Sequence, residues 1–132
     1  MKRFILILVT SILSICSINA QTCNYKSTDF CIGNVYPNGI KWGNWEYSNI
    51  PITINFSTNE IFIYSKELQY YSIYQEGDAI EDSNGGLTIK CYAYDKNQLR
   101  VCVKYRIDPY GVMQLYIIYN DFAFIYNIVK LN

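Results

Sequence analysis

Residues Leu87 to Ile107 read LTIKCYAYDKNQLRVCVKYRI, two alternating runs joined by a polar turn. In the second run, every other residue from Leu99 to Ile107 is apolar, and the residues between them are basic or cysteine. A period of two is typical of a β-strand with one buried face and one wet face. The segment is therefore predicted to form a β-hairpin with its turn at Asp95-Lys96-Asn97-Gln98.

Similar apolar runs recur along the chain and are separated by short clusters of turn residues. They occupy residues 40–47, 50–56, 60–64, 68–75, 87–94, 99–107, 112–119 and 122–131. No segment sustains a helical period. We therefore predict one all-β domain over residues 40–132, an antiparallel meander of about eight strands that closes into a small barrel or folds as a β-sandwich. Its general look is lipocalin-like, although no family motif accompanies it.

The last two runs are apolar on both faces. Such strands are central in a sheet, or they contact a ligand or partner on the second face.

The amino terminus has the layout of a signal peptide. Lys2 and Arg3 precede an apolar run from Phe4 to Cys16, and a small residue, Ala20, follows. We expect cleavage after Ala20 and a secreted or periplasmic product. Alternatively, Leu13-Ser14-Ile15-Cys16 resembles a bacterial lipoprotein site, which would anchor the protein to a membrane through Cys16. No later run is long enough to cross a bilayer as a helix, so no transmembrane segment is expected in the mature chain.

Four cysteines remain after this cleavage: Cys23, Cys31, Cys91 and Cys102. An even number in a small exported domain is typical of two disulfides. We expect Cys23 to pair with Cys31, which would staple residues 21–39 as an irregular lead-in. Cys91 should pair with Cys102, because a two-residue turn at Lys96-Asn97 sets them opposite each other. A longer turn would shift the register and place Cys91 and Cys102 on opposite faces, and each would then have to pair with Cys23 or Cys31.

Charge and histidine content exclude several classes of function. The chain has 11 basic and 11 acidic residues, and loss of Lys2 and Arg3 leaves nine against eleven. This balance argues against a nucleic-acid partner. The chain has no histidine, which removes Ser-His and Cys-His catalysis, and no Cys-x-x-Cys spacing suggests a metal site. We expect neither a metal nor a cofactor.

Exposed aromatic side chains are the candidate binding residues, since aromatics are 17% of the chain and include 14 tyrosines. The candidates are Trp42, Trp45, Tyr70, Tyr71 and Tyr74. They favour a non-enzymatic binding domain that contacts protein or glycan, with a bacterial cell surface as the setting.

Two other functions stay open. A barrel of this kind could carry a small apolar ligand inside. A carboxylate-based hydrolase would need paired acids, for which the sequence offers only one cluster. That cluster, predicted to be a solvated loop, comprises Glu76, Asp78, Glu81 and Asp82.

Overall fold

The computed structural model describes residues 22–131, so the predicted signal peptide and the lipoprotein alternative at Cys16 lie outside the described residues. Over this range the chain is all-β, and no helix of the described part is long and apolar enough to cross a membrane. The strands are β1 (Thr22–Tyr36), β2 (Gly39–Trp42), β3 (Glu46–Tyr47), β4 (Pro51–Asn55), β5 (Glu60–Tyr64), β6 (Leu68–Glu81), β7 (Leu87–Asp95), β8 (Arg100–Ile107), β9 (Met113–Ile118) and β10 (Phe122–Lys130).

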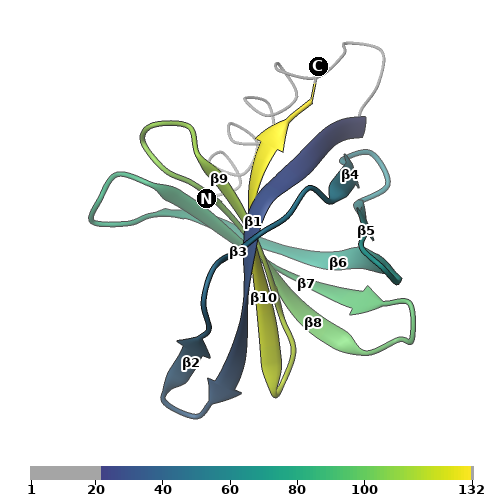
Figure 1. The fold of residues 1–132 in the computed structure, drawn as a ribbon, viewed down its shortest axis with the longest axis horizontal. Coiled ribbons are helices and arrows are strands. Elements are labelled where there is room, and N and C mark those ends of the chain that lie inside the picture. The colour runs from purple at the N-terminus through teal and green to yellow at the C-terminus, as the bar shows by residue number, and fades with distance from the viewer. Residues whose placement is uncertain (1–21, 132) are drawn as a thin grey trace.

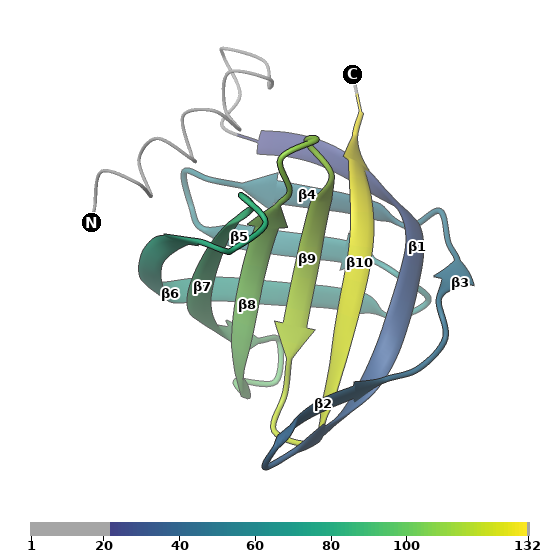
Figure 2. The same cartoon turned by 90° about the vertical axis from the view of Figure 1, so that its left-hand side faces the viewer.

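Eight of these strands form a closed antiparallel barrel. From β4 to β10 each strand pairs with the next, and β1 closes the ring by pairing with β4 and β10. Figure 2 shows β8, β9, β10 and β1 side by side, with the strands of the opposite wall crossing behind them. The prediction of an antiparallel meander closed into a barrel is thus confirmed, and the sandwich alternative does not apply.

The prediction of an irregular lead-in at residues 21–39 is wrong, because this segment contains β1, the longest strand. One edge of β1 pairs with β10, and the other pairs successively with β4, β3 and β2. The β1–β2 hairpin projects beyond the barrel (Figure 1). A bulge between Ser27 and Asp29 shifts the alternation within the strand, so the period of two does not persist along the sequence.

Inward-facing side chains fill the barrel. The most deeply buried include Ile52, Ile54, Ile61, Ile63, Leu115 and Ile117. Complete burial of one such side chain stabilises the fold by about 1.5–3 kcal/mol. The same interior contains Tyr105, whose hydroxyl is the one buried side-chain polar atom of the described residues without a hydrogen-bond partner.

Three turns of identical design connect β6 to β9. They begin at Asp82, Asp95 and Asp108, spaced thirteen residues apart. In each turn the Asp Oδ1 atom accepts hydrogen bonds from the backbone N–H groups two and four residues later, at 2.8–2.9 Å. The residue three positions after each aspartate has a positive φ, and it is Gly85, Gln98 or Gly111. This design is an Asp-capped turn that ends in a left-handed residue.

The turn after Asp95 determines the register of the central hairpin. Its three-residue connection pairs Tyr94 with Arg100 and Cys91 with Val103, one residue away from the predicted alignment. Cys91 therefore faces the interior, and Cys102 lies on the opposite face of the sheet. The predicted two-residue turn at Lys96-Asn97 is therefore wrong, because Gln98 adopts the left-handed conformation that Gly85 and Gly111 adopt in the other two turns.

Neither predicted disulfide is present. Cys31, Cys91 and Cys102 are free thiols, and the hairpin register excludes a bond between the last two. Cys31 lies on β1, where its thiol is buried 3.5 Å from the carbonyl oxygen of Gly43.

The second apolar face of β10 is covered by the chain itself. Ala123 and Ile125 are 0% and 5% exposed although they face outward, and their partners across β1 are Gly33 and Cys31. A Cβ atom on Gly33 would lie 2.7 Å from the ring of Trp42, which extends from β2 over this face. Glycine is thus required for this close approach.

Candidate binding site at the barrel mouth

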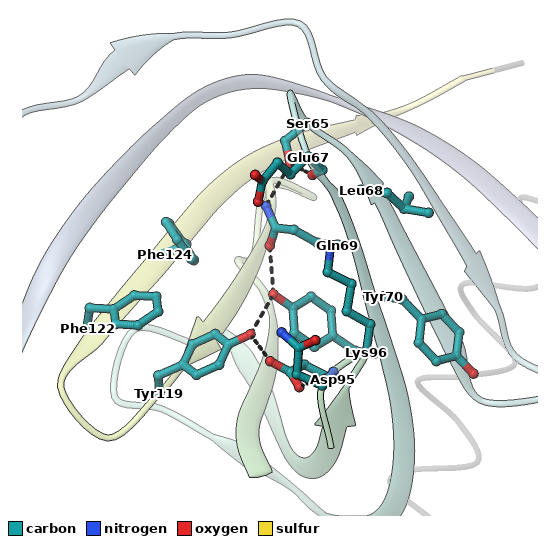
Figure 3. A pocket seen from close by; sticks show the side chains of 12 residues that line it. Ser65, Glu67, Leu68, Gln69, Tyr70, Asp95, Lys96, Tyr119, Phe122 and Phe124 are labelled. Carbon is teal, nitrogen blue, oxygen red and sulfur yellow. Dashed lines mark hydrogen bonds between the residues drawn. The ribbon is translucent and has the colours of Figure 1, made fainter. Parts of the chain in front are cut away.

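A cavity of about 260 Å³ opens at one end of the barrel, among the turns at residues 65–67, 95–99 and 119–122 (Figure 3). Its walls come from β6, β10 and these turns. They comprise Ser65, Glu67, Leu68, Gln69, Tyr70, Tyr71, Asp95, Lys96, Asn97, Tyr119, Phe122 and Phe124. The cavity is slightly smaller than the 300–1,000 Å³ typical of drug-sized ligands.

A chain of polar side chains crosses the cavity wall. The Tyr71 hydroxyl donates to Gln69 Oε1 at 2.7 Å, and the Tyr119 hydroxyl donates to Asp95 Oδ2 at 2.9 Å. Gln69 Nε2 in turn donates to Ser65 Oγ and to the Tyr126 hydroxyl, both at 3.0 Å. Figure 3 shows the part of this chain that runs from Ser65 through Gln69 to Tyr119 and Asp95.

The directions of these hydrogen bonds leave acceptors at the cavity. The Tyr71 and Tyr119 oxygens lie 3.4 Å apart. Because the proton of each hydroxyl is directed elsewhere, to Gln69 or Asp95, both oxygens retain a lone pair for an incoming donor. The site is therefore set to accept hydrogen bonds from a ligand.

Burial keeps both hydroxyls protonated at neutral pH. It raises the pKa of Tyr119 to about 12, and the Asp95 carboxylate adds to the rise. Burial also raises the pKa of Tyr71, and the neighbouring Tyr119 hydroxyl adds to the rise. Neither tyrosine acts as a base near pH 7.

Asp95 connects the hairpin turn to this network. Its side chain is largely buried, with 6% of the residue exposed. Oδ1 is occupied by two backbone N–H groups of its own turn, and Oδ2 by Tyr119. The carboxylate therefore holds the Tyr119 ring in place and accepts three hydrogen bonds from the protein itself.

An aromatic wall stands beside the polar chain. Tyr119 and Phe122 stack with ring centroids 4.5 Å apart, and Phe124 meets Phe122 edge-on at 5.4 Å. Such a wall offers a flat apolar face next to hydrogen-bond acceptors. The sequence signal for it is the run from Phe122 to Tyr126, which is apolar on both faces.

Of the five predicted binding residues, Tyr71 belongs to the cavity wall as a core residue rather than an exposed one. It is 1% exposed and donates into the polar chain. Tyr70, the next residue, borders the cavity, but Figure 3 shows its ring pointing away from Gln69 and Tyr119. Its hydroxyl donates to Glu60 on the outside of β5.

The other three predicted residues lie away from the mouth. Tyr74 is exposed on the outer face of β6 and stacks on Tyr94, with ring centroids 4.6 Å apart. Trp42 covers the outer face of β1 and meets Tyr116 edge-on. Trp45 is exposed in the connection between β2 and β3. The five aromatics therefore do not form one surface.

The acidic cluster was predicted to be a solvated loop, but most of it lies in a strand. Glu76, Asp78 and Glu81 belong to β6, which has a bulge at Gly77 where a Cβ atom would collide with the carbonyl oxygen of Lys90. Asp82 caps the following turn and pairs with Arg106 at 2.8 Å. Among residues 22–131, no group of three or more potential metal-binding side chains comes together.

Gln69, Asp95, Tyr119, Phe122 and Phe124 were not predicted as site residues, because they come together only when β6, β7 and β10 close the barrel. The chain matches no family model, and no curated protein or solved structure is similar enough to it to indicate a relative. A function is therefore proposed from the geometry of the barrel mouth.

Proposed function

We propose that this chain is an exported, non-enzymatic binding domain that takes a small hydroxylated ring, such as one sugar unit, at the barrel mouth. The observation that carries the proposal is the pair of acceptor oxygens on Tyr71 and Tyr119 beside the stacked ring of Phe122. A sugar presents hydroxyl donors along its edge and an apolar C–H face, which match these two features.

Side chains fill the barrel interior, which supports this proposal over the alternative that the protein carries an apolar ligand. Ile61, Ile63 and Ile117 are 0% exposed at the barrel centre, where a carrier would need space for its cargo. The 260 Å³ cavity lies at the rim and has room for a ligand of about ring size.

The hydrogen bonds that the Asp95 carboxylate already accepts support a binding function over a hydrolytic one. Glycoside hydrolysis uses two carboxyl groups about 5–10 Å apart, one of which must exchange a proton. The cavity is bordered by Asp95, whose oxygens both accept hydrogen bonds, and by Glu67 at the exposed rim. The proposal that the protein is exported rests on the signal-peptide layout of its amino-terminal sequence.

Ligand-observed NMR on the protein purified after export is the appropriate test. At roughly 0.3 kcal/mol per non-hydrogen atom, a ligand of about twelve such atoms binds in the millimolar range, where this method is sensitive. We expect signals from one or more neutral monosaccharides in a panel of hexoses, pentoses and amino sugars.

Matched variants test whether the sugar binds at the barrel mouth. Phe122→Leu keeps apolar volume but removes the flat ring, and Tyr119→Phe removes one acceptor. Both should weaken binding at least about fivefold, while Tyr74→Leu, which removes an exposed ring outside the mouth, should leave binding unchanged. The proposal is wrong if no sugar of the panel binds at tens of millimolar, or if Tyr74→Leu has the larger effect.

A further inference from the structure

The outer face of β7 and β8 carries an unusual share of the positive charge. Of the nine Lys and Arg residues in the described chain, four lie on these two strands: Lys90, Arg100, Lys104 and Arg106. They face outward because the alternate residues, such as Ile89, Val101 and Val103, are buried in the core. The cations therefore project from one continuous surface.

Most of this charge has no partner in the protein. Lys90 and Lys104 are directly opposite each other across the two strands, an arrangement that destabilises a sheet. Arg106 is paired with Asp82, but no carboxylate of the described residues lies within ion-pair distance of Lys90, Arg100 or Lys104. An external anion would neutralise this repulsion.

Aromatic rings are interleaved with these cations. Lys90 and Arg100 both contact the ring of Tyr92, at 5.6 and 5.1 Å from its centroid. Arg100 is also the strand partner of Tyr94, which stacks on the exposed Tyr74. A cation thus stands next to an exposed aromatic pair.

The same surface is hollowed toward the mouth end. A depression of about 860 Å³ extends from the outside of β7 and β8 to the turns at residues 95–99 and 119–122. Tyr92, Arg100 and Cys102 line it together with Asp121 at its edge. Cys102 is a half-buried free thiol beside Lys104. The concavity therefore reaches Tyr92 and Arg100, and the other unpaired cations lie beside it on the same two strands.

We propose that this outer face binds an acidic polysaccharide, with the sugar rings on Tyr74 and Tyr94 and the carboxylate or sulfate groups on Arg100, Lys90 and Lys104. An extended acidic peptide fits less well, since the closed barrel offers no free strand edge for backbone pairing on β7 and β8. The proposal goes beyond the mouth site and does not require it.

The test is binding of fluorescent polygalacturonate to the exported protein at low salt, with neutral dextran, poly-glutamate and a single-stranded DNA oligomer as comparisons. The triple variant Lys90→Gln, Arg100→Gln, Lys104→Gln removes the patch. Its matched control, Lys26→Gln, Lys66→Gln, Lys130→Gln, removes the same charge elsewhere. We expect about tenfold or greater weakening for the first and less than about twofold for the second, with affinity falling as salt rises.

A second readout follows from Cys102. Bound polygalacturonate should slow the alkylation of Cys102 by a maleimide, and the more deeply buried Cys31 and Cys91 should react slowly throughout. Tyr74→Ala should weaken polygalacturonate binding, whereas the mouth variant Tyr71→Phe should not. Equal weakening by the two triple variants would overturn the proposal, as would tighter binding to poly-glutamate or to DNA.

Discussion

Tyr71 and Tyr105 are buried in the same barrel, but their hydroxyl groups have opposite surroundings. The Tyr71 hydroxyl lies at the mouth, donates to Gln69 and has the Tyr119 oxygen as its neighbour. The Tyr105 hydroxyl is buried and has no hydrogen-bond partner. Buried polar groups are normally satisfied, and a satisfied group that borders a cavity is a better sign of a binding site than an isolated one.

The largest effect should come from removing the mouth tyrosine altogether. Tyr71→Ala creates a cavity in the core and breaks the polar chain, so we expect a loss of about 3–5 kcal/mol in the free energy of unfolding. Tyr74→Ala, at an exposed position, should cost less than about 1 kcal/mol. Urea denaturation of both variants measures the difference, and similar small losses would mean that Tyr71 is not a core residue.

The next largest effect tests the network at Asp95. Asp95→Ala removes the turn cap and the acceptor of Tyr119, and should cost about 2–4 kcal/mol. Asp108→Ala removes the same cap from an equivalent turn whose aspartate makes no contact with a tyrosine network, and should cost about 1–2 kcal/mol. Equal losses in thermal or urea unfolding would show that the link to Tyr119 adds nothing.

Removing one hydroxyl group should lower the stability of the fold at Tyr71 but leave it unchanged or raise it at Tyr105. Tyr71→Phe leaves Gln69 Oε1 without its donor, so we expect destabilisation by about 1–2 kcal/mol. Tyr105→Phe removes an unsatisfied buried hydroxyl, so we expect no loss or a gain of up to about 1 kcal/mol. Destabilisation by Tyr105→Phe equal to that of Tyr71→Phe would indicate that Tyr105 has a partner.

Near neutral pH the protonation of these tyrosines should have almost no effect. Burial raises the pKa of Tyr25 to about 12, and it raises the pKa of Tyr119 equally far. A group whose pKa is raised by folding contributes stability below its ordinary pKa of ~10, and this contribution is lost as the pH rises toward 12. Unfolding monitored by circular dichroism should therefore be nearly flat from pH 7 to 8 and steepen above pH ~10. Between these ranges stability should decline gradually, because burial also raises the pKa of the Cys91 thiol to about 12. A loss of stability already complete by pH 9 would contradict this burial.

The sequence predicted the barrel well because most strands from residue 50 onward alternate cleanly or are wholly apolar, β6 with its two irregularities being the exception. It failed at β1, where a bulge after Ser27 interrupts the alternation. It also failed at the β7–β8 turn, where Gln98 adopts the left-handed conformation for which Gly85 and Gly111 are the obvious signals. The thirteen-residue spacing of Asp82, Asp95 and Asp108 would have identified that turn.

The candidate site was harder to predict than the fold. Among the predicted aromatics, Tyr70 and Tyr71 border the mouth, and only Tyr71 has its side chain in the polar network. Adjacent residues of a strand point to opposite faces, so a cluster of tyrosines in the sequence does not make a cluster in space. Gln69, Asp95 and Tyr119 come from strands or turns far apart in sequence, and their meeting depends on the closure and register of the barrel.

We propose that a sugar-sized ligand binds at the mouth between the Tyr71–Tyr119 pair and Phe122. The most direct measurement is a ¹H–¹⁵N NMR titration of the protein with the best-binding monosaccharide. We predict that the largest shifts occur at the Gln69 side-chain amide and at the backbone amides of Asn97 and Phe122, which all border the cavity. Shifts confined to the outer face around Tyr74 and Tyr94, with Gln69 unmoved, would contradict the account.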